Sequence, residues 1–279
     1  MVKLRDRKVN VTKKNPGAFA GTSAERLEFL GVGIAYTASR DSKRFQAIAN
    51  VSFTVEENEF VCVVGPSGCG KSSLMLAAAG LVPISSGAIK IGDTRVDGPG
   101  RDRAVVFQSA SLLPWRSVLE NVIYGLEIMK VDKSDASRRG MDIIKLVGLE
   151  GFEGHYPHEL SGGMQQRVNL ARALVVDPGI LLMDEPFAAL DSQTREVMQA
   201  ELLRIWGEMR KSVLFITHQI EEAVFLGDRV IVLSKGPGTV ITKIIDVDFE
   251  RPRAETIKRT PKFIEIVDEI WNCIRYSSA

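Results

Sequence analysis

A glycine-rich stretch that ends in lysine and serine offers the clearest chemistry in the chain. Residues 65–72 read Gly-Pro-Ser-Gly-Cys-Gly-Lys-Ser, which fits the pattern G-x-x-x-x-G-K-[ST]. Glycines let the backbone curl so that successive N–H groups converge on an anion, and the positive end of a following helix points at the same place. Lys71 would meet the β- and γ-phosphates, and the Ser72 hydroxyl would ligate Mg²⁺. The predicted nucleotide contacts are Gly65, Pro66, Ser67, Gly68, Cys69, Gly70, Lys71, Ser72 and Ser73. Cys69 occupies a variable position, so we interpret its thiol as a bystander rather than a nucleophile.

Two carboxylates follow an apolar run further along the chain. Residues 180–185 read Ile-Leu-Leu-Met-Asp-Glu. An acidic residue at the end of a buried strand is the second half of a phosphate-loop site, because it holds the metal ion directly or through water. Asp184 is predicted to take this role. Glu185 stands one residue further on, where a carboxylate can polarise an attacking water molecule.

A second anion site is predicted where residues 160–167, Leu-Ser-Gly-Gly-Met-Gln-Gln-Arg, open a helix. Ser161 is a good N-cap, and Gly162 and Gly163 leave the start of the helix bare. Exposed N–H groups together with the helix dipole attract negative charge. His218 follows another apolar run, Val-Leu-Phe-Ile-Thr. It is either a core histidine or a ligand-facing one, and the carboxyl end of a parallel strand favours the second interpretation.

The elements that must position these residues follow from hydrophobic patterning. Strand-like runs cover 27–36, 51–55 and 60–65, with a polar loop at 37–46 and a helix at 71–80 that stops at Gly80. Residues 87–96 alternate like one half-buried strand. A helix-rich middle, with helices at 133–147 and 164–175, precedes apolar strands at 180–184, 212–218 and 229–234, an extended piece at 239–249 and an amphipathic helix at 256–276. Wholly apolar strands are typical of a parallel sheet that is covered by helices on both faces.

Composition sets the outer limits. The chain has 279 residues, of which 45% are hydrophobic and 25% charged, as in ordinary globular proteins. A net charge of +1 gives little grip on a nucleic acid backbone. The sequence lacks an apolar run long enough to cross a bilayer, and its basic start lacks the apolar core of a signal peptide. Three cysteines at unrelated spacings indicate reduced thiols. We therefore expect the chain in the cytoplasm.

The motif Leu-Ser-Gly-Gly-Met-Gln-Gln-Arg closely resembles the signature motif of ABC-type ATPases. The phosphate loop, the Asp-Glu pair, the glutamine of Val-Val-Phe-Gln, the Ala-Ala-Leu-Asp after Asp-Glu-Pro, and Ile-Thr-His-Gln follow in that family's order. The resemblance runs from about Leu27 to Ser234. It implies an α/β fold, a P-loop NTPase (RecA-like) core with an antiparallel β subdomain and an inserted helical subdomain. The expected division is a basic, flexible tail at 1–24, the ATPase domain at 25–250 with its helical subdomain at about 109–176, and a C-terminal helical extension at 251–279.

The same resemblance implies roles for single residues. Gln108 would touch Mg²⁺ and the attacking water and sense a membrane partner, and His218 would orient that water together with Glu185. In the family, an aromatic residue stacks on the adenine; Tyr36 is preferred here, with Phe45 as the rival. Residues of the opposite subunit would complete the site: Ser161, Gly162, Gly163 and Gln165 of the signature helix, and Asp191 at the end of the loop 189–191 that crosses the dimer. The implied cofactors are ATP and Mg²⁺, with Ser72, Gln108 and Asp184 at the metal.

The implied partners are a second copy of the chain, two transmembrane permease subunits and, indirectly, a solute-binding protein outside the membrane; no nucleic acid is expected. Residues 112–115, Leu-Leu-Pro-Trp, are either local core or a patch for a helix of the permease. With the segments around Gln108 and Arg251-Pro252-Arg253, they resemble the nitrate, sulfonate and taurine branch of bacterial ABC importers. The resemblance implies peripheral attachment to the cytoplasmic face of the inner membrane. Two alternatives stay open: an exporter or lipid-transport ATPase, and a soluble, non-transport ABC ATPase.

Overall fold

A computed structural model describes residues 25–37 and 44–276, and the predicted basic tail at 1–24 lies outside this range. The centre of the fold is a parallel sheet whose strands pair in the order β9-β3-β8-β7-β6. The strands are β3 (Phe60–Val64), β6 (Arg103–Val106), β7 (Ile180–Asp184), β8 (Ser212–Ile216) and β9 (Arg229–Leu233). Every residue of β3 and β8 is buried. The prediction that the wholly apolar runs form doubly covered parallel strands is therefore confirmed.

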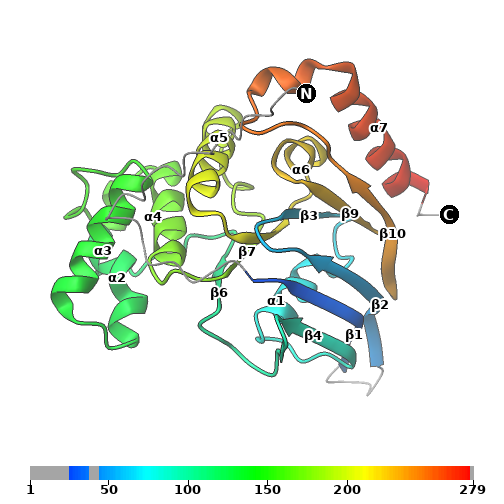
Figure 1. The fold of residues 1–279 in the computed structure, drawn as a ribbon, viewed down its shortest axis with the longest axis horizontal. Helices are drawn as coiled ribbons and strands as arrows, with labels where there is room; N and C mark the ends of the chain where they lie inside the picture. The colour runs from blue at the N-terminus through cyan, green and yellow to red at the C-terminus, as the bar shows by residue number, and fades with distance from the viewer. Residues whose placement is uncertain (1–24, 38–43, 277–279) are drawn as a thin grey trace, which may run out of the picture.

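An antiparallel sheet continues from one edge of this core. Its strands are β1 (Leu27–Thr37), β2 (Arg44–Val55), β4 (Ser86–Ile91), β5 (Thr94–Arg95) and β10 (Thr239–Asp246). β1 pairs antiparallel with both β2 and β4, whereas β10 joins the two sheets by pairing with β2 and β9. The ten strands form one sheet that curls around α1 (Lys71–Ala78), as Figure 1 shows.

Two hydrophobic cores lie on the two faces of the parallel sheet. Side chains alternate along β3, so that Phe60, Cys62 and Val64 enter one core while Val61 and Val63 enter the other. The first core lies under the helices that cover the outer face, and the second encloses α1 between the parallel and antiparallel strands. Because α1 is held from both sides, the loop before it has a rigid base.

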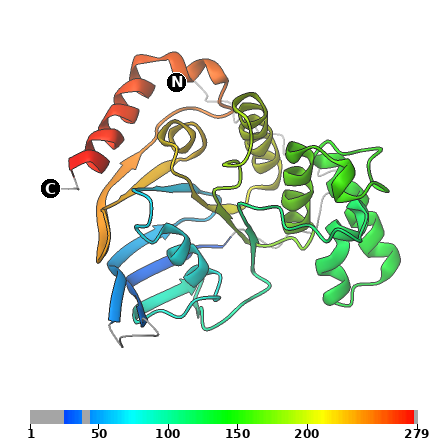
Figure 2. The same cartoon turned by 180° about the vertical axis from the view of Figure 1, so that it is seen from behind.

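The inserted helices form a separate lobe between β6 and β7. They are α2 (Val118–Ile128), α3 (Lys133–Leu146) and α4 (Gly162–Leu174), preceded by the short 3₁₀ helix η1 (Pro157–Glu159). Figures 1 and 2 show this lobe at the end of the molecule opposite the last helix. Ser117 and Glu120 form a capping box at the start of α2, and the Asp132 side chain caps α3.

Three further helices cover the outer face of the parallel sheet: α5 (Ser192–Met209), α6 (Ile220–Leu226) and α7 (Pro261–Tyr276), with the 3₁₀ helix η2 (Glu255–Arg259) before α7. Arg251 and Arg253 both reach the end of α6, where they donate hydrogen bonds to the carbonyls of Leu226 and Gly227 respectively, each at 2.7 Å. Burial, and secondarily the neighbouring Arg251, lowers the pKa of Arg253 to about 10, which leaves it charged at neutral pH. The two arginines therefore fasten the start of the C-terminal segment to the core.

Several expectations about elements need correction. The run 87–96 is a hairpin and not one strand, because Gly92 adopts a φ of 55° and turns the chain between β4 and β5. The predicted loop 37–46 is shorter, since residues 44–46 already belong to β2. The helix predicted from 256 begins at Pro261, a residue that suits a first helical position, and 3₁₀ helix η2 precedes it. The helices at 133–147 and 164–175 are confirmed within two residues of their ends.

Candidate functional site

The phosphate-binding loop joins β3 to α1. Gly70 is the N-cap of α1 with a φ of 95°, a region that favours glycine, and no side chain caps the helix there. A Cβ on Gly70 would approach Ile48 to 3.1 Å. The first N–H groups of α1 are therefore free of a side-chain cap at the place where the sequence predicts an anion.

Lys71 turns back into this loop. Its Nζ donates hydrogen bonds to the carbonyl oxygens of Gly65 at 2.8 Å and Pro66 at 3.0 Å, and the side chain is buried. The Cys69 Sγ lies 4.0 Å from Lys71 Nζ, and burial raises the pKa of the Cys69 thiol above its ordinary value. Cys69 is accordingly a protonated, enclosed thiol at neutral pH, as expected of a bystander.

Ser72 and Asp184 meet across the site from different elements. The Ser72 Oγ, in the first turn of α1, donates to Asp184 Oδ1 at the end of β7 over 3.0 Å. Burial first, and the Glu185 carboxylate second, raise the pKa of Asp184, while the bond from Ser72 opposes the shift. A hydroxyl and a carboxylate are hard oxygen donors, which suit Mg²⁺ when nucleotide phosphates and water supply its other ligands. Among the described residues no cluster of three or more His, Cys, Asp or Glu side chains could hold a metal by itself.

Glu185 and His218 follow the carboxyl ends of the neighbouring parallel strands β7 and β8. The Glu185 Oε2 lies 2.8 Å from His218 Nδ1, and about half of the His218 side chain is exposed, which excludes a core histidine. Glu185 has a φ of 44°, in a region that ordinary residues seldom adopt, while its N–H donates to the carbonyl of Ile216 at 2.9 Å. The main chain after β7 is thus bent so that Asp184 faces Ser72 and Glu185 faces His218. Strained backbone of this kind is typical of functional sites.

Tyr36 and Phe45 lie opposite one another in the β1–β2 pair. Both are exposed, at 41% and 50%, so the structure offers two aromatic faces at the same end of the sheet. The Tyr36 hydroxyl donates to Ser73 Oγ in the first turn of α1 over 2.7 Å. This bond places Tyr36 beside the phosphate loop.

The signature motif opens α4 as the sequence predicts. The Ser161 Oγ accepts from the N–H of Met164 at 3.3 Å, which makes Ser161 the N-cap. The Gln165 side-chain amide donates to the carbonyls of Pro157 at 2.9 Å and Leu160 at 3.3 Å, so in this state it braces the segment that leads into the motif. Ser161 and Gly163 line a hollow next to α5 that shares no residue with the hollow at the phosphate loop. Within one chain the two predicted anion sites are therefore separate.

The loop 189–191 ends in Asp191, which caps α5. Its Oδ1 accepts from the Thr194 N–H at 3.0 Å, and this bond lowers the pKa of the Asp191 carboxyl. Arg195, on the first turns of α5, donates to the carbonyls of Phe187 at 3.2 Å and Leu190 at 2.6 Å. Arg195 thus fixes the loop between β7 and α5, a role for which the sequence gives no motif.

Gln108 follows β6 and is exposed. Its neighbours are held by α4, because Asn169 Nδ2 donates to the Phe107 carbonyl at 3.1 Å and Arg172 Nη2 donates to the Ala110 carbonyl at 2.8 Å. These two positioning residues were missed by the sequence analysis. In the sequence, only the helical spacing of Asn169 and Arg172 on one face of α4 points to a shared role. That spacing does not indicate which segment the two side chains contact.

Part of the segment 112–115 belongs to the local core, and part of it is exposed as a contact patch would be. Leu112 packs against the core, whereas Trp115 is 71% exposed. The buried Asn121 of α2 holds the segment by accepting from the Leu113 N–H at 2.8 Å and donating to the Arg116 carbonyl at 2.9 Å. Local packing therefore presents a large aromatic side chain to solvent close to Gln108 in the sequence.

None of the helices in the part of the chain that the structure describes is both long and apolar enough to cross a membrane.

Comparisons with known proteins agree with this geometry. The family model of the ABC transporters matches residues 48–188. An ABC transporter ATP-binding protein of Methanocaldococcus jannaschii is 49% identical over 235 residues, covering 84% of this chain and 86% of that protein. The taurine import ATP-binding protein TauB of Rhizobium johnstonii is 50% identical over 240 residues, covering 84% of this chain and 91% of that protein.

Solved structures give the same result for the fold. The dimeric structure of a bacterial ABC transporter cassette is similar with a TM-score of 0.69 at 32% identity, and the match covers 80% of this chain and 100% of that one. A post-hydrolysis dimer of that cassette with bound ADP and Pi matches equally well. With its phosphate loop, its paired carboxylates and its inserted helical lobe, the chain belongs to the ABC transporter family, as one of that family's ATP-binding ATPase subunits.

Proposed function

We propose that this chain is the ATP-hydrolysing subunit of an importer for small organic sulfonates or related anions, and that it works through separate membrane subunits. The observation that carries the hydrolytic part is the Glu185–His218 pair at 2.8 Å beside Asp184 and Ser72. The identity with taurine import ATP-binding proteins of Rhizobium johnstonii and Escherichia coli, at 50% and 45%, supports the direction and the solute class.

The proposed chemistry is attack of water on the γ-phosphate. Glu185 polarises the water, and His218 fixes the orientation of that carboxylate through its Nδ1. Lys71 exchanges its bonds to the loop carbonyls for bonds to the phosphates, which places positive charge where the transition state is most negative. Mg²⁺, when bound between Ser72, Asp184 and Gln108, would neutralise further charge on the phosphates.

We infer that each active site is shared between two copies. Lys71 and the first turn of α1 bind the triphosphate in one copy, and the bare start of α4 at Ser161–Gly163 in the other copy closes on the γ-phosphate. The separation of the two anion sites within one chain supports this arrangement, because neither site can complete the other in cis. ATP favours the closed dimer to the extent that it binds that form more tightly.

Closure is transmitted to the membrane subunits through the segment after β6. Gln108 lies at the nucleotide end of this segment, and the exposed Trp115 offers an apolar contact for a helix of the permease. Asn169 and Arg172 tie the segment to α4, so that movement of the signature helix also moves the contact surface. The protein would lie on the cytoplasmic face of the membrane, and a solute-binding protein on the opposite side would deliver the cargo.

The experiment that tests the enzymatic part uses Glu185→Gln and Lys71→Ala. Glu185→Gln should keep ATP binding and form a stable dimer with ATP and Mg²⁺ on gel filtration, because the nucleotide is held but not cleaved. Lys71→Ala should lose ATP binding. The proposal fails if Glu185→Gln stays monomeric under these conditions, or if Lys71→Ala still hydrolyses ATP.

Uptake measurements test the solute class. Cells that lack this chain should lose uptake of radiolabelled taurine, and the wild-type chain but not Glu185→Gln should restore it. Competition with unlabelled alkanesulfonates or nitrate would identify the preferred anion within the class. Taurine uptake that is unchanged in the deleted cells, or efflux of solute that depends on the chain, would contradict the proposed import.

A further inference from the structure

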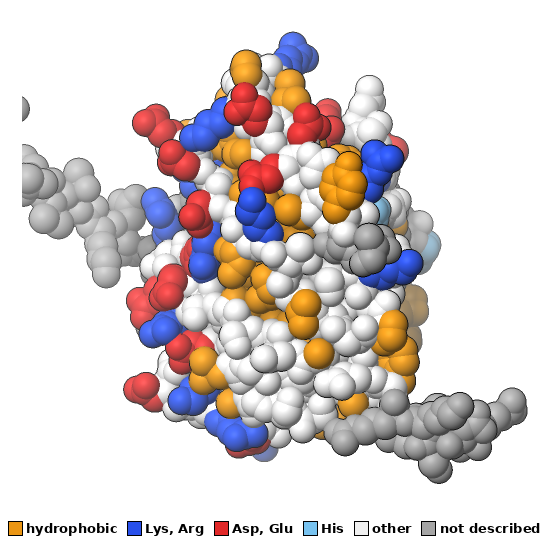
Figure 3. Space-filling view, turned by 90° about the vertical axis from the view of Figure 1, so that its right-hand side faces the viewer, with side chains coloured by type: hydrophobic (Ala, Val, Ile, Leu, Met, Phe, Trp, Pro, Cys, Tyr) orange, Lys and Arg blue, Asp and Glu red, His pale blue; other side chains and the backbone are white. Residues whose placement is uncertain are grey.

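The last helix carries two apolar stripes, one of them fully buried and the other only partly covered. Phe263, Ile266 and Ile270 recur at helical spacing and are buried against α6 and β9. Ile264, Val267 and Trp271 repeat that spacing one position further along the helix, and Trp271 is 57% exposed. Figure 3 shows hydrophobic side chains at the surface on the side of the molecule to which α7 belongs.

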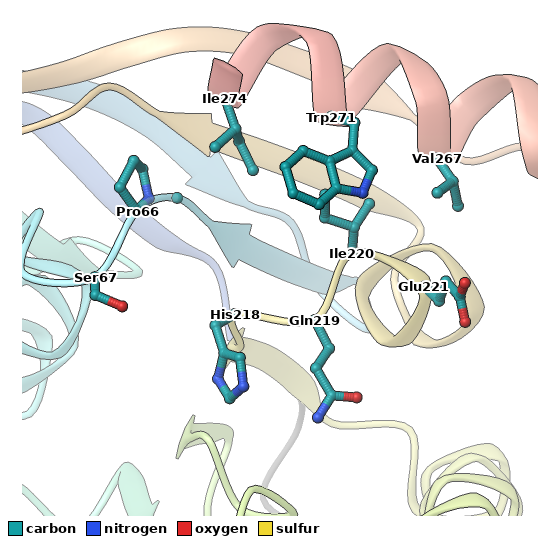
Figure 4. Close-up of a pocket in the computed structure, with 10 residues that line it drawn as sticks. Pro66, Ser67, His218, Gln219, Ile220, Glu221, Val267, Trp271 and Ile274 are labelled. Carbon is teal, nitrogen blue, oxygen red and sulfur yellow. The ribbon is translucent and has the colours of Figure 1, made fainter. Parts of the chain in front are cut away.

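Val267 and Trp271 of the second stripe, together with Ile274, form one wall of a groove that ends at the active site. Val267, Trp271 and Ile274 hang from α7 toward the loop after β8, and the Trp271 ring lies above Ile220 (Figure 4). The opposite rim consists of Pro66 and Ser67 from the phosphate loop together with His218 and Gln219. The groove has a volume of about 480 Å³, which is enough for several side chains.

We propose that this groove receives a second copy of the chain when ATP closes the dimer, so that α7 extends the interface at the nucleotide. The inference rests on the shared active site proposed above. Pro66, Ser67 and His218 line the groove, and in the proposed active site they also lie around the γ-phosphate. A copy that brings its signature helix to that phosphate therefore arrives at the rim of the groove.

The lining discriminates against other occupants. It contains Glu221 and no lysine or arginine, so a second nucleotide or another polyanion would meet an unfavourable charge. The surface that we assign to the permease lies around Trp115, just before α2, and Figure 1 shows α2 at the other end of the molecule from α7. An aromatic, partly apolar surface next to the proposed dimer contact is typical of the interior of a protein–protein interface.

Helix α7 is held firmly enough to form part of a dimer contact. Besides the buried stripe, Glu269 of α7 forms an ion pair with Lys243 of β10, and Lys262 pairs with Asp248. Trp271 thus needs little ordering before it binds, which makes it a candidate for the dominant residue of the contact. A two-fold dimer forms the contact twice, so one substitution removes two copies of it.

The test measures dimerisation by sedimentation in the Glu185→Gln background with ATP and Mg²⁺. Adding Trp271→Ser should weaken the dimer at least about tenfold, because both copies lose the aromatic contact. Ile128→Ser is the matched control, since Ile128 is a similarly exposed apolar residue on α2. It should leave the dimer unchanged. ADP affinity, measured on the monomers, should be the same in all variants and shows that they are folded.

Tryptophan emission gives a second readout that locates the contact. In a Trp115→Phe variant of the same background, Trp206 is buried and Trp271 is exposed, so only Trp271 can become shielded. ATP should shift the emission to shorter wavelength, the shift should vanish with Trp271→Phe, and ADP should not cause it. A dimer that persists undiminished in Trp271→Ser overturns this inference alone, and so does an equal shift with ADP. Loss of the ATP-dependent dimer in Glu185→Gln itself overturns the proposed function together with this inference.

Discussion

Two adjacent carboxylates at the end of β7 have different surroundings. Asp184 accepts a hydrogen bond from Ser72 and is partly buried, whereas Glu185 turns the other way, with a φ of 44°, toward His218. Burial and the charge of Glu185 both raise the pKa of Asp184. The Asp184 carboxylate therefore carries its negative charge in surroundings that disfavour a negative charge. Such a group is suited to a metal ion that compensates its charge.

Replacing Asp184 with Asn tests this electrostatic cost. The folded-state pKa of Asp184 is raised above its ordinary value of 3.8, which means that ionisation of this carboxyl destabilises the folded protein. The destabilisation is absent below pH 3.8 and complete above the raised pKa. In the presence of EDTA, Asp184→Asn should therefore have a higher free energy of unfolding than the wild type at neutral pH. The difference should shrink as the pH is lowered toward the ordinary value. Urea unfolding at several pH values measures this difference, and an Asn variant that is less stable at neutral pH would refute the account.

The ATPase activity of the Asp184→Asn variant should fall at least about a hundredfold.

The choice between Tyr36 and Phe45 can be decided at the same scale. Tyr36 is fixed beside the phosphate loop by its bond to Ser73 Oγ, so we expect it to stack on the adenine. Tyr36→Ala should weaken ADP binding about tenfold, in keeping with the loss of an aromatic stacking contact. Phe45→Ala, at the paired position, is the control and should bind ADP normally. The reverse pattern in a fluorescence titration would assign the stacking role to Phe45.

At the scale of elements, the sequence predicts most of what surrounds the phosphate. Glycine spacing predicts the loop 65–70 and the helix after it. Continuous apolar runs predict the strands β7 and β8. The Ser161 cap follows from residue type and is present. These features are local, which is why one sequence suffices to find them.

Other elements escaped prediction for physical reasons. α6 is seven residues long and nearly all buried, so it has no polar face that would show a helical period. β6 has four residues and only Val106 is buried. In α5 the buried Met198, Leu202 and Trp206 do recur at helical spacing, so that pattern was sufficient and was overlooked. The positive φ of Glu185 and the braces from Arg172 and Arg195 depend on tertiary contacts, which no local pattern encodes.

The brace at the start of α2 leads to a prediction for the segment 112–115. Asn121 is fully buried and bonds the main chain at Leu113, Arg116 and Ser117. Asn121→Ala would remove the partners of the partly buried Leu113 N–H and Arg116 carbonyl and should destabilise the protein by about 2–4 kcal/mol. Urea unfolding of this variant, with the exposed Asn272→Ala as control, checks the value. An unchanged unfolding midpoint would show that the segment is held by other contacts.

At the scale of the whole molecule, the two predicted anion sites lie in different parts of the chain, which supports the proposal that one copy is incomplete by itself. The phosphate loop lies in the sheet domain, and the bare helix start of α4 lies in the inserted lobe, where it lines a different hollow. In the proposed dimer, a second copy in head-to-tail orientation would bring the two together twice, and ATP would be the contact that holds the copies closed. In the same proposal, hydrolysis would remove that contact, and the membrane subunits would follow the opening.

Cross-linking between chains tests this central claim most directly. Ser67 and Ser161 are both exposed, so cysteines can be placed there in a Glu185→Gln, Cys273→Ser background, in which the remaining native cysteines, Cys62 and Cys69, are buried. Chains with Ser67→Cys are mixed with chains that carry Ser161→Cys, and a short thiol cross-linker is added with ATP or with ADP. We predict cross-linked dimers with ATP and none with ADP. Dimers that form with ATP but do not cross-link, or a monomer with both cysteines that cross-links within itself, would contradict the shared site.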